Sequence, residues 1–419
     1  MAATNESAAA AAAAAAQAVA ETCVAGGVQD AGGSPGGLIY LTSFVGMIFA
    51  LVLLKQVAAV QLDVTSTPGA RRTDASAEEN SKLVELYEAI RTGANSFLMA
   101  EYKLCALFVA VVFPCMSFLI AWGAGTSDGW AWSSGWLSGV SFIVGALTSM
   151  LSGFIGMRVA VYSNARCTVG ACSPTTGWTH SFNTAFRAGG VMGFSLTGIA
   201  LLSLYLLIGF LRPAFGEDRH GLEQLMDVVA GFGLGGSAIA MFGRVGGGIY
   251  TKAADVGADL AGKVVEDLPE DDPHNPGTIA DNVGDNVGDV AGMGSDLFGS
   301  FGEASCAALL VGASSPMIVA GGWGALMFPL TVSGSGILVC LVTNYVATDF
   351  KPVRCETDIE KVLKMQLLVS SVLMTPVVLI LSLAFLPRAT CGDCIGGFEV
   401  SGVCSSALII ITEHLIIIR

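Results

Sequence analysis

Charged side chains are scarce in this sequence, and basic ones are the scarcest. Only 13% of the 419 residues are charged, and Lys and Arg together number 20. They form no basic patch that could meet a phosphate backbone, which argues against nucleic acid as a partner. Cys391 and Cys394 are the one close cysteine pair, and they lack the second pair or the neighbouring histidines that a zinc site requires. A loop disulfide is the remaining interpretation of that pair.

Two familiar signals are also missing. The glycine run at 246–248 is not followed by Gly-Lys-Ser/Thr, so it is not a P-loop and does not by itself indicate a nucleotide. Close helix packing is the alternative explanation for that run. No basic segment precedes an apolar core at the N-terminus, which argues against a signal peptide. We expect the alanine-rich lead at 1–35 to be disordered.

Apolar residues, in contrast, are abundant. They make up 53% of the chain, the mean hydropathy is +0.67, and there are 53 glycines, a composition typical of a polytopic membrane protein with closely packed helices. The sequence therefore predicts an all-α polytopic membrane protein over 36–419. Nine apolar runs are long enough to be membrane helices: 36–60, 96–122, 136–161, 188–211, 222–248, 281–313, 316–346, 362–386 and 400 onward.

The basic residues predict the orientation of these helices. If the first polar loop lies in the cytosol and the sides alternate, 17 of the 20 basic residues fall on the cytosolic side. Such an excess is what the positive-inside rule requires, with the N-terminus on the other side. The same alternation places residues 244–296, the most acidic part of the chain, at the cytosolic mouth.

This acidic window predicts a cation site. Eleven acids lie between Asp255 and Asp296, and only two lysines and one histidine are near enough in sequence to offset them. So many like charges pack together only if cations hold them, because each charge raises the cost of ionising the next.

Two acidic helix faces flank a turn within the window. Asp281, Asp285 and Asp289 are spaced by four residues, so they lie along one face of a helix. Asp255 and Asp259 repeat the spacing on the preceding helix. Three prolines interrupt the segment between them, 266–277, which we expect to form a turn that brings the two faces together.

Ligands that are all oxygen suit a hard cation such as Mg²⁺ or Ca²⁺ and not zinc or copper. Lys252 precedes Asp255 by three residues, and carboxylates with a lysine are typical of sites that hold a magnesium–phosphate complex. A solvated acidic face is the alternative. We disfavour it because the glycines and valines between the aspartates leave little room for an open exterior.

Acidic residues continue into the apolar part of the last of these helices. Asp289, Asp296 and Glu303 are spaced by seven residues and share one stripe. Glu303 lies roughly 33 Å along the helix from Asp281, within the bilayer. Acids at that depth are costly and usually mark an ion or proton path. Arg244, on the preceding helix, is the expected partner of Asp296.

Three segments of the window resemble a known family. GRVGGGIYTKAADVGADL, EDDPHNPGTIADNVGDNVGD and GMGSDLFGS are similar to the signature segments of the membrane-integral inorganic pyrophosphatases, the pyrophosphate-energised proton or sodium pumps. The resemblance implies a subunit of sixteen helices, usually a homodimer, that hydrolyses magnesium pyrophosphate at the cytosolic face and exports an ion. It implies a multi-pass protein of a vacuolar or other acidic-organelle membrane.

The resemblance also implies roles for single residues. The substrate and its magnesium ions would be bound by Lys252, Asp255, Asp259, Glu270, Asp281 and Asp285. Asp289, with Asp285 beside it, would activate the attacking water. The ion would pass a gate formed by Arg244, Asp296 and Glu303. Glu303 combined with Gly299 resembles the proton-pumping, potassium-stimulated branch, whereas sodium pumps carry the glutamate one turn earlier.

The chain departs from the family in one respect. The family's site needs a second set of aspartates and lysines from later helices, and residues up to Arg419 contain no such set. We therefore expect this chain to represent about half of a pump and not to hydrolyse pyrophosphate by itself. Two other functions stay open: an intramembrane magnesium-dependent prenyltransferase, which also holds a diphosphate on Asp-x-x-x-Asp faces, and a divalent-cation channel with an acidic vestibule.

Overall fold

The computed structural model describes residues 28–29, 34–62, 74–125, 129–265, 267–269, 272, 275–386 and 388–389. Most of the lead at 1–35, Glu270, the cysteine pair at 391 and 394, and the predicted helix from 400 onward lie outside the described residues. The described part is a bundle of helices, with one short pair of antiparallel strands, β1 (Val28–Gln29) and β2 (Arg388–Ala389).

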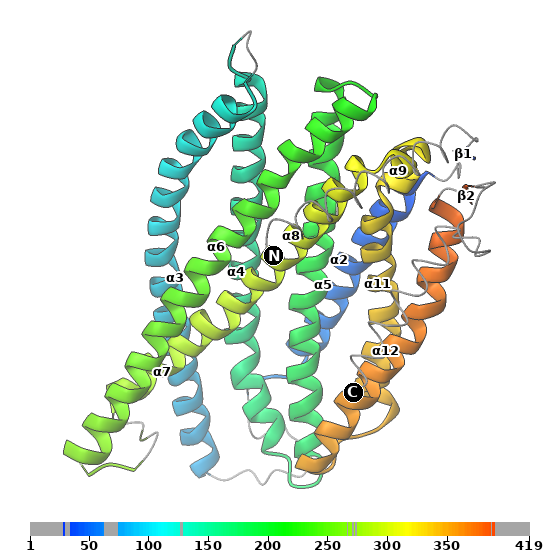
Figure 1. Cartoon of the computed structure of the whole chain (residues 1–419). Coiled ribbons are helices and arrows are strands. Elements are labelled where there is room, and N and C mark those ends of the chain that lie inside the picture. The colour runs from blue at the N-terminus through cyan, green and yellow to red at the C-terminus, as the bar shows by residue number, and fades with distance from the viewer. Residues whose placement is uncertain are drawn as a thin grey trace, which may run out of the picture.

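Long helices run side by side through the bundle (Figure 1). The first half of the chain forms α2 (Pro35–Ala58), α3 (Asp74–Gly123), α4 (Trp132–Ala171), α5 (Gly177–Leu211), the short 3₁₀ helix η2 (Arg212–Ala214) and α6 (Arg219–Asp259). The second half forms η3 (Leu260–Val265), α7 (Pro276–Gly284), η4 (Asp285–Ala291), α8 (Gly292–Ser314), α9 (Pro316–Ala320), α10 (Gly322–Leu326), α11 (Phe328–Tyr345), η5 (Val346–Phe350) and α12 (Glu356–Phe385).

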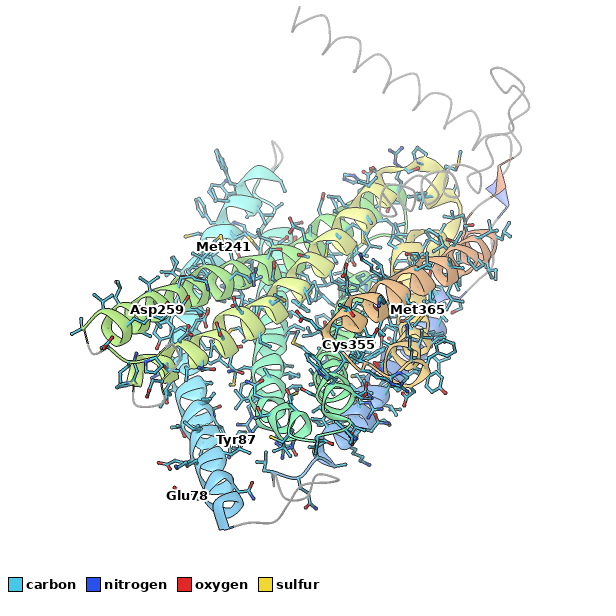
Figure 2. All side chains as sticks on the ribbon, turned by 90° about the horizontal axis from the view of Figure 1, so that it is seen from below. Glu78, Tyr87, Met241, Asp259, Cys355 and Met365 are labelled. Carbon is cyan, nitrogen blue, oxygen red and sulfur yellow. The ribbon has the colours of Figure 1, made fainter. Side chains whose placement is uncertain are left out.

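The packing has two sides. On one side α2 packs on α5 and α11, and a large apolar core joins α2, α5, α6, α8 and α11. On the other side α6 packs against both α4 and α8, and α3 lies on α4. Seen from below, α6 and α8 run side by side, with the labelled side chains of Met241 and Asp259 projecting from α6 (Figure 2).

The predicted fold class is confirmed. In the part of the chain that the structure describes, eight helices are long and apolar enough to cross a membrane, and they match the first eight predicted runs. Pro114 and Pro376 lie inside α3 and α12, whereas Pro329 lies in the first turn of α11, where a missing N–H costs nothing.

The prediction of a single helix over 316–346 is wrong. The structure divides this run into α9, α10 and α11. Gly322 has a φ of +80°, a backbone conformation outside the helical region, and a proline opens both α9 and α11. Hydropathy cannot detect these breaks, because the residues on either side of them are equally apolar.

Two helices are longer than their apolar runs. α3 begins at Asp74 instead of residue 96, and α6 continues past residue 248 to Asp259. The added part of α3 is polar and carries ion pairs at helical spacing, Lys82 with Glu78 and Arg91 with Glu88. Such pairs support a helix in water, so a helix can extend beyond the membrane where no hydrophobic signal marks it.

Candidate functional site at the α6–α8 pair

Glycines bring α6 into backbone contact with η4 and with α8, which continues from η4. A Cβ atom added to Gly247 would lie 2.3 Å from the Cα of Gly288, and one added to Gly292 would lie 2.9 Å from the carbonyl oxygen of Gly243. The two contacts show that the facing segments are antiparallel. From Gly243 to Gly247 the chain of α6 advances by four residues, while the facing residue moves back by four, from Gly292 to Gly288. Small residues at such contacts let two membrane helices approach closely. Within the glycine run, Gly247 makes this contact, whereas Gly246 and Gly248 face open space.

A hairpin joins the cytosol-facing ends that we predicted for these helices. α6 passes into the π-helix η3, Asp267 adopts a φ of +53°, and α7 begins at Pro276. The Asn275 side chain accepts a hydrogen bond from the Gly277 N–H as the N-cap of α7, and its Nδ2 donates to the carbonyl oxygen of Ala258 at 2.9 Å. The predicted turn is therefore present, and Asn275 ties it to the end of α6.

The hairpin brings a lysine and three aspartates together. Lys252 Nζ lies 3.7 Å from Asp255 Oδ2 on α6. Across the helix pair, the Asp285 carboxylate interacts electrostatically with Asp289, Lys252 and Asp255. We call these four residues the acidic mouth. Both acidic faces thus contribute to it, as their spacing predicts.

Two other predicted ligands, Asp259 and Asp281, lie nearer to the hairpin turn in sequence than the acidic mouth does. Asp259 pairs with Lys263, one turn further along its own helix, at 3.5 Å. Asp281 lies partly buried on α7, one turn before the mouth. Glu270 is outside the described residues, so its predicted place in the site stays a prediction.

A π-helical segment carries the central aspartates. η4 spans Asp285–Ala291, so its backbone follows a wider turn than the regular α-helix that we assumed from the four-residue spacing. Val283 and Val287 are buried on the packed face, and the buried Asn286 accepts a hydrogen bond from Asn164 of α4 at 2.9 Å. Short π-helical segments within α-helices are frequent at functional sites.

Our expectation of a closed exterior is wrong for the described chain. Asp285 and Asp289 are exposed, and the valines and glycines next to them in sequence, at 283, 284, 287 and 288, are buried on the packed face. Large apolar residues are exposed beside them, among them Ile249 of α6 and Leu297 of α8. The acidic mouth therefore lies on an open face that is partly apolar, and that face differs from an ordinary hydrated surface.

Deeper along the pair, two contacts link α6 to α8. Arg244 Nε lies 3.8 Å from Asp296 Oδ2, which is the pairing that the sequence predicts. Ser237 Oγ donates a hydrogen bond to Glu303 Oε2 at 2.8 Å, a contact that the sequence reasoning missed. Ser237 precedes Arg244 by seven residues and Glu303 follows Asp296 by seven, so the matching intervals on antiparallel helices could have identified it.

The donor chemistry of the mouth suits a hard cation, but its ligand set is incomplete. Carboxylate oxygens are the ligands that Mg²⁺ prefers. Among the described residues, however, no three acidic, histidine or cysteine side chains converge closely enough to hold a metal ion. The described residues therefore fit magnesium in the type of ligand and not in its number.

Comparison with known proteins identifies the family. A model of the family "Inorganic H+ pyrophosphatase" matches residues 44–416. The chain is 38% identical to a K(+)-insensitive pyrophosphate-energized proton pump of Caldanaerobacter subterraneus over 63% of its own length and 36% of that pump. It is 39% identical to a putative K(+)-stimulated pyrophosphate-energized sodium pump of Bacteroides thetaiotaomicron over 63% and 36%. A proton pump of Chloroflexus aurantiacus is 34% identical over 74% and 39%.

The chain spans about a third of the length of these curated relatives. Neither the prenyltransferase nor the channel gains support from them, since all three are described as pyrophosphate-energized pumps. A family match that covers most of the chain, together with acids on two adjoining membrane helices, leads to one conclusion: this chain belongs to the inorganic H+ pyrophosphatase family.

Proposed function

We propose that this chain supplies one side of the pyrophosphate site and part of the ion path of a pyrophosphate-energised proton pump. The observation that carries the proposal is the acidic mouth, in which Lys252 lies 3.7 Å from Asp255 and both interact electrostatically with Asp285, as does Asp289. Magnesium, when bound, would neutralise charge on the diphosphate. Its protein ligands would be Asp255, Asp259, Glu270, Asp281 and Asp285.

We assign the side chains of the acidic mouth to two roles, positioning of the diphosphate and activation of the attacking water. Lys252, with Asp281 nearby on α7, would position the diphosphate. The ammonium group of Lys252 attracts the negative charge of the diphosphate, whereas the carboxylates repel it. Asp289, next to Asp285, would accept a proton from the attacking water as a general base. Its exposure on the open face leaves room for that water.

We propose that the proton leaves along α8. Arg244, Asp296 and Glu303 would form the path, with the Ser237 hydroxyl as a fixed donor to Glu303. The proton is favoured over sodium because Gly299 stands where the sodium pumps of the family carry a glutamate. A Cβ there would lie 3.1 Å from the Cα of Ser237, so the position has little space for a longer side chain.

The setting of the site is also part of the proposal. We infer a cytosolic mouth from the excess of basic residues on that side, and an acidic organelle such as the vacuole as the compartment. Potassium is the second cation we propose, although one relative is named K(+)-insensitive and another K(+)-stimulated. A homodimer and further ligands from a segment that covers the open face of α6 and α8 would complete the pump.

Co-expression tests the proposal. The chain would be produced alone and together with the remainder of the Caldanaerobacter pump, and phosphate release from magnesium pyrophosphate would be measured. We expect no release by the chain alone and steady release by the pair of fragments. Asp289→Asn should abolish that release, and Glu360→Gln, an exposed acid of α12 that pairs with Lys364, should leave it unchanged.

Two results would contradict the proposal. One is fragments that assemble without hydrolysing pyrophosphate. The other is transfer from a labelled allylic diphosphate, or a divalent-cation flux that Lys252→Ala leaves untouched, either of which would restore one of the alternative functions.

A further inference from the structure

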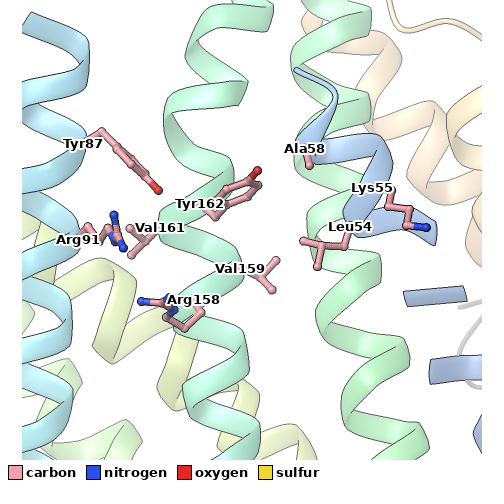
Figure 3. A pocket seen from close by; sticks show the side chains of 9 residues that line it. All are labelled: Leu54, Lys55, Ala58, Tyr87, Arg91, Arg158, Val159, Val161 and Tyr162. Atoms are coloured by element: carbon pink, nitrogen blue, oxygen red, sulfur yellow. The ribbon is translucent and has the colours of Figure 1, made fainter. Parts of the chain in front are cut away.

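A second charged site lies between α2, α3 and α4, and none of the four residues of the acidic mouth lines it. A cavity of about 530 Å³ opens there, with apolar walls formed by residues such as Leu54, Val159 and Val161. Lys55, Arg91 and Arg158 line the same cavity, one from each helix (Figure 3). In the part of the chain that the structure describes, no acidic side chain lines it. We call this cavity the basic groove.

Acidic side chains of the described protein neutralise only part of the positive charge of the basic groove. Arg91 pairs with Glu88, one turn away on α3, at 2.9 Å. Arg158 has no acidic partner among the described residues and lies only near the ring of Phe154, 5.9 Å from its centroid. In Figure 3 the Arg91 and Arg158 side chains project into the space between α3 and α4, while the Lys55 ammonium points outward at the rim. Two guanidinium groups that face one groove favour an anion between them.

A third arginine contacts the groove through one of its lining residues, Tyr162. Arg166, two turns after Arg158 on α4, is 8% exposed, and its guanidinium carbon lies 3.4 Å from the centroid of the Tyr162 ring. Tyr162 lines the basic groove. Arg166 has no carboxylate partner among the described residues, and its Nε has no hydrogen-bond partner there. The buried charge therefore adds to the positive potential of the groove, which is not an ordinary solvated surface.

The depth of the groove matches the membrane interface. Lys55, Arg91 and Arg158 each lie within five residues of the end of an apolar run, and all three ends are on the side we predict to be cytosolic. Tyr87 and Tyr162 also line the groove, and tyrosines are enriched where membrane meets water. Towards the middle of the bilayer, Leu51 on the Lys55 face of α2 and Met99 on the Arg91 face of α3 are 59% and 48% exposed.

We propose that the basic groove binds an anionic phospholipid, with its headgroup phosphate on Arg91 and Arg158 and its acyl chains along α2 and α3. Basic pockets between membrane helices on the cytosolic side recognise such headgroups. The apolar walls favour a phosphate that carries an acyl tail over free phosphate or pyrophosphate. None of the residues of the acidic mouth lines this site, so the proposal does not depend on the enzymatic function.

Binding of a short-chain phosphatidic acid to the purified chain in detergent tests the proposal, with short-chain phosphatidylcholine as the neutral-headgroup comparison. Arg158→Gln should weaken phosphatidic acid binding about fivefold, the effect of about 1 kcal/mol for one basic residue near a membrane surface. Lys364→Gln removes a cation from an exposed pair on α12 and should leave the affinity unchanged. Thermal unfolding of each variant shows that the fold is intact.

A measurement on the unmodified chain supports the test if Arg158→Gln does not fold. A photoactivatable phosphatidic acid should cross-link to peptides of α2, α3 or α4 that line the groove. Cross-links confined to other helices would overturn the proposal. So would equal binding of phosphatidylcholine, equal weakening by Lys364→Gln, or displacement by free phosphate or pyrophosphate at the concentration at which the lipid itself binds.

Discussion

The two faces of the α6–α8 pair differ in what they contact: the inner face packs against backbone, and the outer face is exposed. On the inner face, glycines such as Gly247 and Gly288 bring the backbones into contact, and most of the buried side chains beside them are small or apolar, with Asn286 as the polar exception. On the outer face, carboxylates alternate with exposed apolar residues such as Leu297. The inner face fixes which residues stand opposite each other, and the outer face uses that alignment to form polar contacts. Helix packing and the proposed chemistry thus reside on opposite sides of the same two helices.

The largest expected effect comes from disturbing the inner face. Gly247→Ala places a Cβ 2.3 Å from the Cα of Gly288, where only backbone movement can relieve the clash, so we expect a loss of about 3 kcal/mol in stability. Gly246→Ala is the matched control, because its Cβ meets open space and alanine favours the helix by about 1 kcal/mol. Thermal unfolding in detergent compares the two variants, and equal midpoints would show that the glycine contact does not hold the pair.

A moderate effect is expected where a hydroxyl reaches across to the outer face. Ser237→Ala removes the hydrogen-bond donor to Glu303 and should cost about 1 kcal/mol. Ser370→Ala removes an exposed hydroxyl that bonds only within its own helix and should cost much less. If Ser237→Ala and Ser370→Ala lower the unfolding midpoint by the same amount, the Ser237 contact is not stabilising.

A smaller effect is expected from the ion pair on the outer face. The side chains of Arg244 and Asp296 are 41% and 51% exposed and 3.8 Å apart, so their coupling should be below about 1 kcal/mol. A double-mutant cycle with Arg244→Gln and Asp296→Asn measures it, and the exposed Lys364–Glu360 pair serves as the reference. A coupling of several kcal/mol would mean that this part of the face is shielded from water.

Magnesium alone should have the smallest effect. Because no three ligands converge among the described residues, we expect weak binding, and a Kd well above the added concentration stabilises by only about 0.2 kcal/mol. Unfolding midpoints with Mg²⁺ and with a chelator at equal ionic strength provide the comparison. A shift worth more than about 1 kcal/mol would indicate that the mouth is already a complete metal site.

Much of the fold could be predicted because a bilayer imposes a length of apolar sequence. The polar extension of α3 from Asp74 could not, since its helix is supported by pairs such as Lys82–Glu78 and not by burial. The breaks before α10 and α11 depend on backbone angles, such as the positive φ of Gly322, that hydropathy does not encode.

At the site, spacing predicted the Arg244–Asp296 contact and the meeting of the two acidic faces, because both follow from helix periodicity. It did not predict the π-helical turn of η4, which is a matter of hydrogen-bond pattern, nor the exposure of Asp285. Ser237 was missed because a single hydroxyl in an apolar helix carries no charge pattern, although its seven-residue interval from Arg244 was present in the sequence.

Because α6 and α8 are aligned at several contacts, their packing should tolerate a change of side chain better than a change in the number of residues between the contacts. One residue inserted between Ser237 and Gly247 would rotate everything after it by about 100° relative to the part before it. The Ser237–Glu303 contact and the Gly247–Gly288 contact could then no longer form together. Relatives that work in the same way should therefore vary in the side chains of these two helices while keeping the number of residues between the contacts.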